Sequence, residues 1–162
     1  DYHYSKDLNL KNRQKQIFIE QIRLAKTLDL PIVIHSRDAD FDTLNIIKEE
    51  LPPIIDLHCF SGSYEIYREY IKMPIKTFIG GVVTFKNAKV IKEIVEKGDI
   101  KTFLTETDAP YLTPTPFRGE RNDPSYLPYV IKTISELKKL DIDETSKILL
   151  NNGEEFYGID QD

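Results

Sequence analysis

Cysteine is scarce in this chain. Cys59 is the single cysteine among 162 residues, so no disulfide can form within the chain and a reducing compartment is the simpler expectation. Long apolar runs are absent too, since none approaches the roughly 18 residues that a membrane span requires, and no charged segment followed by an apolar one resembles a secretory leader. We therefore expect a cytoplasmic protein with no membrane partner.

The chain also lacks a block of positive charge. It carries 27 acidic and 22 basic residues, for a formal net charge of −5, and the basic residues are scattered along the sequence. Broad neutralisation of a phosphate backbone by one basic face is therefore excluded. A nucleic-acid substrate would have to be held locally, by a metal ion and a few cationic side chains.

What the chain does contain is the composition of one globular domain over residues 1–162, with 40% hydrophobic and 30% charged residues. Short apolar segments rich in Ile, Val and Phe predict strands that are covered on both faces, as in a parallel sheet. The four predicted strands are Pro31 to His35, Ile54 to Phe60, Thr77 to Val83 and Thr102 to Thr107.

Apolar residues at helical spacing lie between and after the predicted strands. Before the first strand they include Phe18, Ile22 and Ala25, with Ile17, Leu24 and Leu28 beside them; before the second they are Leu44, Ile47 and Leu51. A later helix carries Leu127, Val130, Ile131, Ile134 and Leu137, and a final one is expected to begin at a cap on Asp143 and to stop near Gly158.

The alternation of strands and helices predicts an α/β fold of the TIM-barrel type. A complete barrel needs about 250 residues, so four strands make roughly half of one. The chain also begins at Asp1 without a methionine, which suggests a fragment. We expect the open sheet edges to be covered by a missing N-terminal half, by a second copy or by additional packing.

Three polar residues lie at the carboxyl ends of the predicted strands. His35 ends the first strand, His58 lies near the end of the second and Asp108 follows the fourth. Strand ends of this kind meet on one rim of a barrel. Two imidazoles and a carboxylate form a ligand set for Zn²⁺ or a similar ion, which lowers the pKa of a bound water to about 7. The alternative is that each histidine is an ordinary hydrogen-bonded group at a strand end.

Five local sequences resemble the TatD family closely, in the same order. They are DYHY (Asp1 to Tyr4), IHSRDA (Ile34 to Ala39), HCFSGS (His58 to Ser63), GGVVTFKNAK (Gly80 to Lys89) and ETDAPYLTPTPFRGERNDP (Glu106 to Pro124). The resemblance covers essentially the whole chain, and it points to the C-terminal part of the family's barrel.

The resemblance implies a metal-dependent hydrolase that cleaves phosphodiester bonds of DNA, with two divalent ions, zinc, manganese or magnesium, in the complete site. His35 and His58 would be ligands of one ion, and Asp108 would bind the other ion or deprotonate the attacking water. The family's His-x-His pair and bridging glutamate belong to strands that would precede Asp1. This chain therefore carries only part of the ligand set, and we expect it to bind metal weakly on its own.

The loop after the fourth strand offers further candidates. Glu106 lies two positions before Asp108, so it is either a second carboxylate at the metal or a supporting group behind the ligands. Arg118 and Arg121 flank Gly119, where a guanidinium can hold a phosphate through two hydrogen bonds. Ordinary salt bridges within the loop explain these arginines equally well.

The remaining candidates lie elsewhere in the matched sequences. Ser61 and Ser63 follow the second strand, where they either face a phosphate or simply cap a helix. His3 is expected to line the substrate wall or to pack beside the site. Cys59 alternates with His58, which predicts a buried side chain that points away from the rim.

Gly80 and Gly81 end the third strand, and they either leave room for substrate or satisfy a turn.

Two other functions compete with DNA hydrolysis. A metal-dependent amidohydrolase that acts on a C–N or ester bond would use the same rim. A catalytically incomplete half-barrel that acts only by association remains the non-enzymatic alternative.

Overall fold

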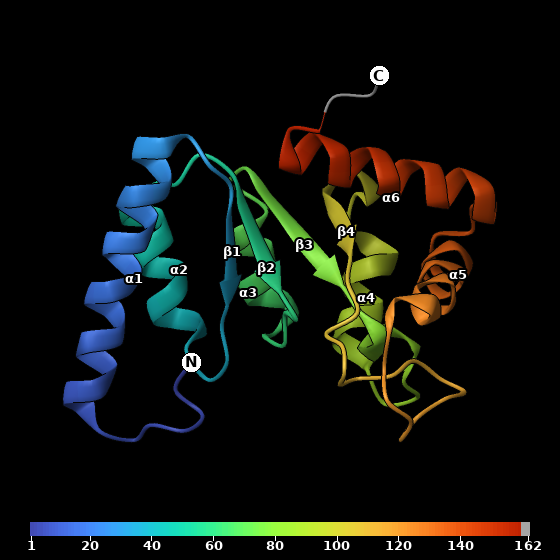
Figure 1. The fold of residues 1–162 in the computed structure, drawn as a ribbon, viewed down its shortest axis with the longest axis horizontal. Coiled ribbons are helices and arrows are strands. Elements are labelled where there is room, and N and C mark those ends of the chain that lie inside the picture. The colour runs from blue at the N-terminus through green and yellow to red at the C-terminus, as the bar shows by residue number, and fades with distance from the viewer. Residues whose placement is uncertain (160–162) are drawn as a thin grey trace. The chain divides into compact units, whose positions relative to one another are not determined.

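A computed structural model of the chain describes residues 1–159 and contains four strands with flanking helices (Figure 1). The strands form two parallel pairs, β1 with β2 and β3 with β4, so the predicted α/β class with parallel strands is confirmed. Two compact units, Asp1–Ile75 and Lys76–Asp162, are distinguished by their internal packing. The prediction of a single domain over 1–162 stays a prediction.

The first unit builds its core on β1 and β2. The two strands run in register from the Ile32–Ile55 pair to the His35–His58 pair, and Ile34 and Leu57 are both buried. Tyr67 also contributes to this core. The elements are α1 (Leu8–Leu28), β1 (Ile32–His35), α2 (Asp40–Glu50), β2 (Ile55–His58) and α3 (Tyr64–Tyr70).

The long first helix, α1, covers the unit only partly. Asp7 caps it by accepting a hydrogen bond from the backbone N–H of Asn9 at 2.7 Å, and Arg23 binds Glu50 at the end of α2 through two hydrogen bonds of 2.9 and 2.7 Å. Among its apolar residues Ile22 is fully buried, whereas Leu24 is 50% exposed. The predicted helix is thus confirmed, but much of its apolar face is accessible in the structure.

The second unit is built around β3 and β4. Ile79 and Phe103, one from each strand, are fully buried, as is Ile134 from the helix α5. The elements are β3 (Ile75–Ile79), η1 (Gly81–Thr84), α4 (Lys89–Lys97), η2 (Ile100–Thr102), β4 (Phe103–Thr105), η3 (Pro124–Tyr126), α5 (Leu127–Lys138) and α6 (Ile142–Tyr157). None of the helices in residues 1–159 combines the length and the apolar character that crossing a bilayer requires.

Several predicted element ends were wrong by a few residues, each for a local reason. β3 ends at Ile79 because the chain turns into the short helix η1 at Gly81. Leu51 is the C-cap of α2 in a left-handed conformation and is 63% exposed, so it lies outside the helix core. Asp141 caps α6 in place of Asp143, whereas the predicted stop at Gly158 is confirmed.

Candidate functional site

His35 and His58 lie side by side at the carboxyl ends of β1 and β2. They are direct partners in the parallel register, and their ring centroids are 5.8 Å apart with an interplanar angle of 42°. Residues paired in register point to the same face of a sheet. The structure therefore brings together the two imidazoles that the sequence placed at the ends of successive strands. Their role as metal ligands stays a prediction.

His35 has a carboxylate partner that the sequence did not indicate. Its Nε2 lies 3.0 Å from Oδ2 of Asp1, and the two side chains are 49% and 30% exposed. His3, which was expected beside the site, places its Nδ1 3.1 Å from Oδ2 of Asp38 in the loop after β1, and its role stays a prediction. His3 and His35 are thus each paired with an aspartate. The pairing depends on how the N-terminal segment folds back, which no local sequence pattern reveals.

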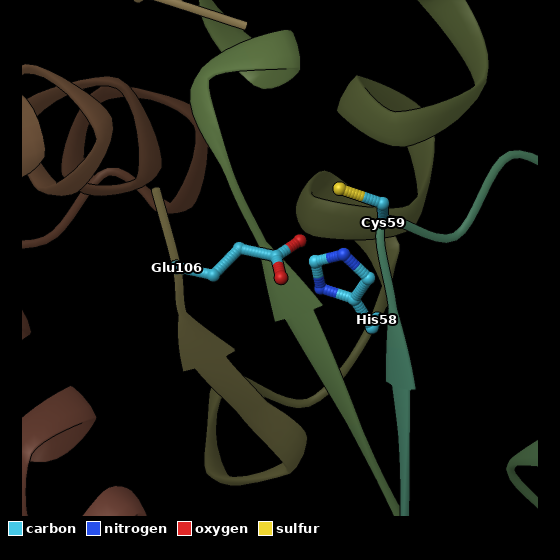
Figure 2. A group of neighbouring side chains, drawn as sticks. All are labelled: His58, Cys59 and Glu106. Carbon is cyan, nitrogen blue, oxygen red and sulfur yellow. The ribbon is translucent and has the colours of Figure 1, made fainter. Parts of the chain in front are cut away.

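Cys59 does not behave as its alternation with His58 predicted. β2 ends at His58, and Cys59 adopts a left-handed backbone with φ 47°, so the alternation rule for strands no longer applies. Its side chain is only partly buried, and its sulfur lies within 4.8 Å of a ring nitrogen of His58. Figure 2 shows the two side chains at the end of β2. The prediction of a buried residue that points away was wrong.

Asp108 lies in the loop after β4, in an unusual backbone conformation. Its φ is 56°, a left-handed region that aspartate tolerates better than most residues. Its carbonyl oxygen accepts a hydrogen bond from the backbone N–H of Tyr111 at 2.8 Å, and the hydroxyl of Thr107 accepts one from Ala109 at 3.3 Å. The loop thus forms a tight, hydrogen-bonded turn around Asp108.

The two glycines after β3 lie close to the segment that follows β4. A Cβ at Gly80 would lie 3.0 Å from Cγ of Glu106, so the absence of a side chain at Gly80 leaves room for Glu106. A Cβ at Gly81 would overlap the carbonyl oxygen of Leu112. Gly81 is therefore required by the close approach of the loop that follows β4.

The two arginines of this loop differ in their surroundings. The guanidinium of Arg118 stacks over the ring of Phe85, 3.6 Å from its centroid, an arrangement that favours arginine over lysine. Arg121 is exposed and lies near Asp123, whose pKa is lowered first by hydrogen bonds from Ser125 and to a smaller degree by the Arg121 charge. Phosphate binding by either arginine stays a prediction.

The serines after β2 favour the simpler of their two interpretations. Ser63 is the N-cap of α3, and its hydroxyl accepts a hydrogen bond from the backbone N–H of Ile66 at 3.3 Å. Ser61 is exposed. Capping therefore accounts for Ser63 without a ligand.

A cavity of about 300 Å³ lies in the first unit and reaches His35. Its wall includes Tyr2 and Asp42, joined by a hydrogen bond of 2.7 Å from the tyrosine hydroxyl. Burial, and then the hydrogen bond to Asp42, raise the pKa of Tyr2 to about 12. The rest of the wall combines apolar residues of β1, α1 and α2 with five polar ones: Asp1, Gln14, Lys15, Gln21 and Thr43.

The sequence profile of the family described as TatD related DNase matches residues 1–158. The chain belongs to the TatD family. It is 47% identical over 161 residues to the uncharacterized metal-dependent hydrolase YabD of Bacillus subtilis, a match that covers 98% of this chain and 62% of that protein. It is also 32% identical over 164 residues to the uncharacterized metal-dependent hydrolase YcfH of Escherichia coli K12, a match that covers 99% of this chain and 60% of that protein. The chain thus spans about 60% of the length of these curated relatives.

Solved structures agree with the family assignment. The TatD homologue YjjV of Escherichia coli K12 superposes with a TM-score of 0.85 at 30% identity, covering 92% of this chain and 58% of that one. A TatD family hydrolase from Entamoeba histolytica matches with a TM-score of 0.81 at 18% identity, covering 97% and 60%, and so supports the fold alone. These neighbours are TIM-barrel-like, and the chain is a member of a family of metal-dependent hydrolases.

Proposed function

We propose that this TatD-family chain belongs to a metal-dependent phosphodiesterase that hydrolyses DNA, with His35 and His58 as metal ligands and Asp108 as the group that positions and deprotonates water. The pairing of His35 with His58 carries the proposal. Two imidazoles whose centroids lie 5.8 Å apart, at the carboxyl ends of parallel strands, suit zinc or a similar divalent ion. The family's name and its hydrolase relatives support the same chemistry.

The chemistry of each group follows from its type. A divalent ion, when bound, supplies the positive charge that acidifies water and offsets the charge on phosphate oxygens. The carboxylate of Asp108 accepts the proton that the attacking water loses, as a general base does. Arg118 is the proposed phosphate contact, because stacking on Phe85 orients its guanidinium in advance and lowers the entropy lost on binding.

The proposed neighbours of the ligands have supporting roles. Asp1 lies 3.0 Å from Nε2 of His35, so its carboxylate can orient the ring, as partners of metal-binding histidines commonly do. Glu106 is proposed to support Asp108 from two residues away, and Ser61 and Arg121 to contact the phosphate backbone. We also propose a cytoplasmic location, because the single cysteine at Cys59 permits no internal disulfide.

The test is a hydrolysis assay on the protein to which this chain belongs, with single-stranded DNA and excess zinc, manganese or magnesium, because the chain alone carries only part of the ligand set. The proposal expects cleavage that EDTA abolishes and that Asp108→Asn reduces by about 100-fold to 10,000-fold, the typical range for loss of a general base. Asp143→Asn is the matched control, since Asp143 lies in the first turn of α6. Cleavage that persists in EDTA, or that Asp108→Asn leaves unchanged, contradicts the mechanism.

Two alternatives are outcomes of the same assay. Cleavage of chromogenic esters or amides without cleavage of DNA would indicate the amidohydrolase alternative. Absence of any hydrolysis, together with a dimer in analytical ultracentrifugation, would indicate a chain that acts by association. The accessible apolar residues of α1, including the 57% exposed Leu28, are the specific observation that favours association.

A further inference from the structure

A buried asparagine closes the loop that carries Asp108. Asn122 is 2% exposed, and its Nδ2 donates hydrogen bonds to the carbonyl oxygens of Thr107 at 2.6 Å and of Tyr111 at 2.7 Å. These two carbonyls lie on either side of Asp108 in the sequence. The backbone N–H of Asn122 adds a third bond, to the carbonyl oxygen of Pro110 at 3.1 Å. One residue therefore holds the turn at three points.

The chemistry of these contacts requires an amide. Both side-chain partners are carbonyl oxygens, which only accept, so the group between them must donate two hydrogens. The opposite amide orientation would place Oδ1 against two acceptors. A buried carbonyl that loses its donor is destabilised because no water replaces the bond, so the two bonds together constrain the loop strongly.

The loop needs such a constraint because its backbone is strained. Asp108 has φ 56° and Leu112 has the same value, both in a region that costs non-glycine residues free energy unless the surroundings hold them there. The bonds from Asn122 end at Thr107 and Tyr111, so they bracket the first of these residues. The strained conformation determines the direction in which the Asp108 carboxylate leaves the backbone.

We propose that Asn122 is a positioning residue for Asp108: its two amide hydrogens clamp the carbonyls of Thr107 and Tyr111 and hold Asp108 in the left-handed conformation that directs its carboxylate. This inference rests on the proposed function for the catalytic role of Asp108. The clamp itself follows from contacts within the second unit and can be tested without metal or substrate.

The chain provides a matched control at the other end of β4. Asn152 is 6% exposed, and its Nδ2 donates to the carbonyl oxygens of Ile100 and Phe103, both at 2.8 Å. Its chemistry equals that of Asn122, but its partners precede or begin the strand. Asn122→Leu and Asn152→Leu therefore remove the same pair of hydrogen bonds, one beside Asp108 and one remote from it.

The experiment is NMR on the full chain without added metal. Two signals report on the loop: hydrogen-exchange protection of the Tyr111 amide, which donates to the Asp108 carbonyl, and the one-bond Cα–Hα coupling of Asp108, which distinguishes positive from negative φ. Asn122→Leu should lower the protection by about tenfold to a hundredfold and shift the coupling toward negative φ. Asn152→Leu should leave both signals within about twofold of wild type.

A second variant keeps the test decisive if Asn122→Leu fails to fold. In Asn122→Asp an ionised carboxylate faces two carbonyl oxygens, and protonation restores one donor, so both signals should recover as the pH falls. Unchanged signals in Asn122→Leu, equal losses in Asn152→Leu, or no acid recovery in Asn122→Asp would overturn the positioning role. If the clamp behaves as expected but no DNA is cleaved, the proposed function fails and the clamp stands.

Discussion

Replacing Gly81 by alanine tests the packing that holds the loop after β4. Gly81 is buried at the start of η1, and a Cβ there would overlap the carbonyl oxygen of Leu112 and lie 3.2 Å from both its carbonyl carbon and the nitrogen of Pro114. All three atoms belong to backbone, so no rotamer change can relieve the contact. Overpacking of this kind typically costs about 1–3 kcal/mol, and here the loop itself must move.

Gly153 provides the control for the same chemical change. It lies within α6, and a Cβ there would meet no atom within 4 Å. Alanine is preferred to glycine inside a helix by about 1 kcal/mol, so Gly153→Ala should stabilise the chain. The two glycine-to-alanine variants should therefore differ by about 2–4 kcal/mol in their free energies of unfolding.

Urea unfolding followed by far-ultraviolet circular dichroism measures both variants against wild type. We expect the midpoint of Gly81→Ala to fall and that of Gly153→Ala to rise. The tightness of the Leu112 contact would be refuted if Gly81→Ala were as stable as wild type, provided that Gly153→Ala shows its gain. In that case the loop after β4 does not lie against η1 as the structure describes.

Two further predictions concern the first unit. The Asp42 pKa is lowered, chiefly by the hydrogen bond from Tyr2, so its ionised form stabilises the fold above the ordinary value of 3.8 and this contribution is lost as the pH falls below it. Asp42→Asn should therefore lower the melting temperature at pH 7 with a difference that shrinks toward pH 3, and a constant difference would contradict this. Ser63→Ala should cost about 0.5–2 kcal/mol in urea unfolding through loss of the α3 cap, whereas Ser61→Ala should cost almost nothing; equal effects would reject the cap.

The sequence predicted the order of strands because burial leaves a direct trace in composition. Each observed strand falls within or close to an apolar run, since both faces of the strand must be covered. The same logic placed His35 and His58 at neighbouring strand ends, and the register confirms that they lie side by side there. Properties set by periodicity and by strand order are therefore readable from the residues alone.

Features that depend on backbone conformation or on distant pairing were not readable. The contact between Asp1 and His35 joins residues 34 positions apart, and the two carbonyls that Asn122 binds are 15 and 11 positions away. Nothing in a local pattern marks these partners. Cys59 illustrates the effect of backbone conformation. A single left-handed residue after a strand changes the side-chain direction that alternation predicts.

The left-handed residues of the described chain divide into two groups with different causes. Three are helix C-caps, where such a conformation is ordinary: Asp29, Leu51 and Lys139. The other non-glycine examples fall in the segments that follow β1, β2 and β4: Asp38, Cys59, Asp108 and Leu112. Backbone strain of the second kind persists only where the surroundings enforce it, and it concentrates at functional sites.

The segment after β3 also constrains the loop that follows β4. Gly80 and Gly81 lie in succession there, and the absence of a side chain leaves room for Glu106 at Gly80 and for the Leu112 carbonyl at Gly81. The loop around Asp108 is thus fitted by the glycines on one side and clamped by Asn122 on the other. Both constraints act on the loop that carries Asp108, and they agree with the role proposed for that residue.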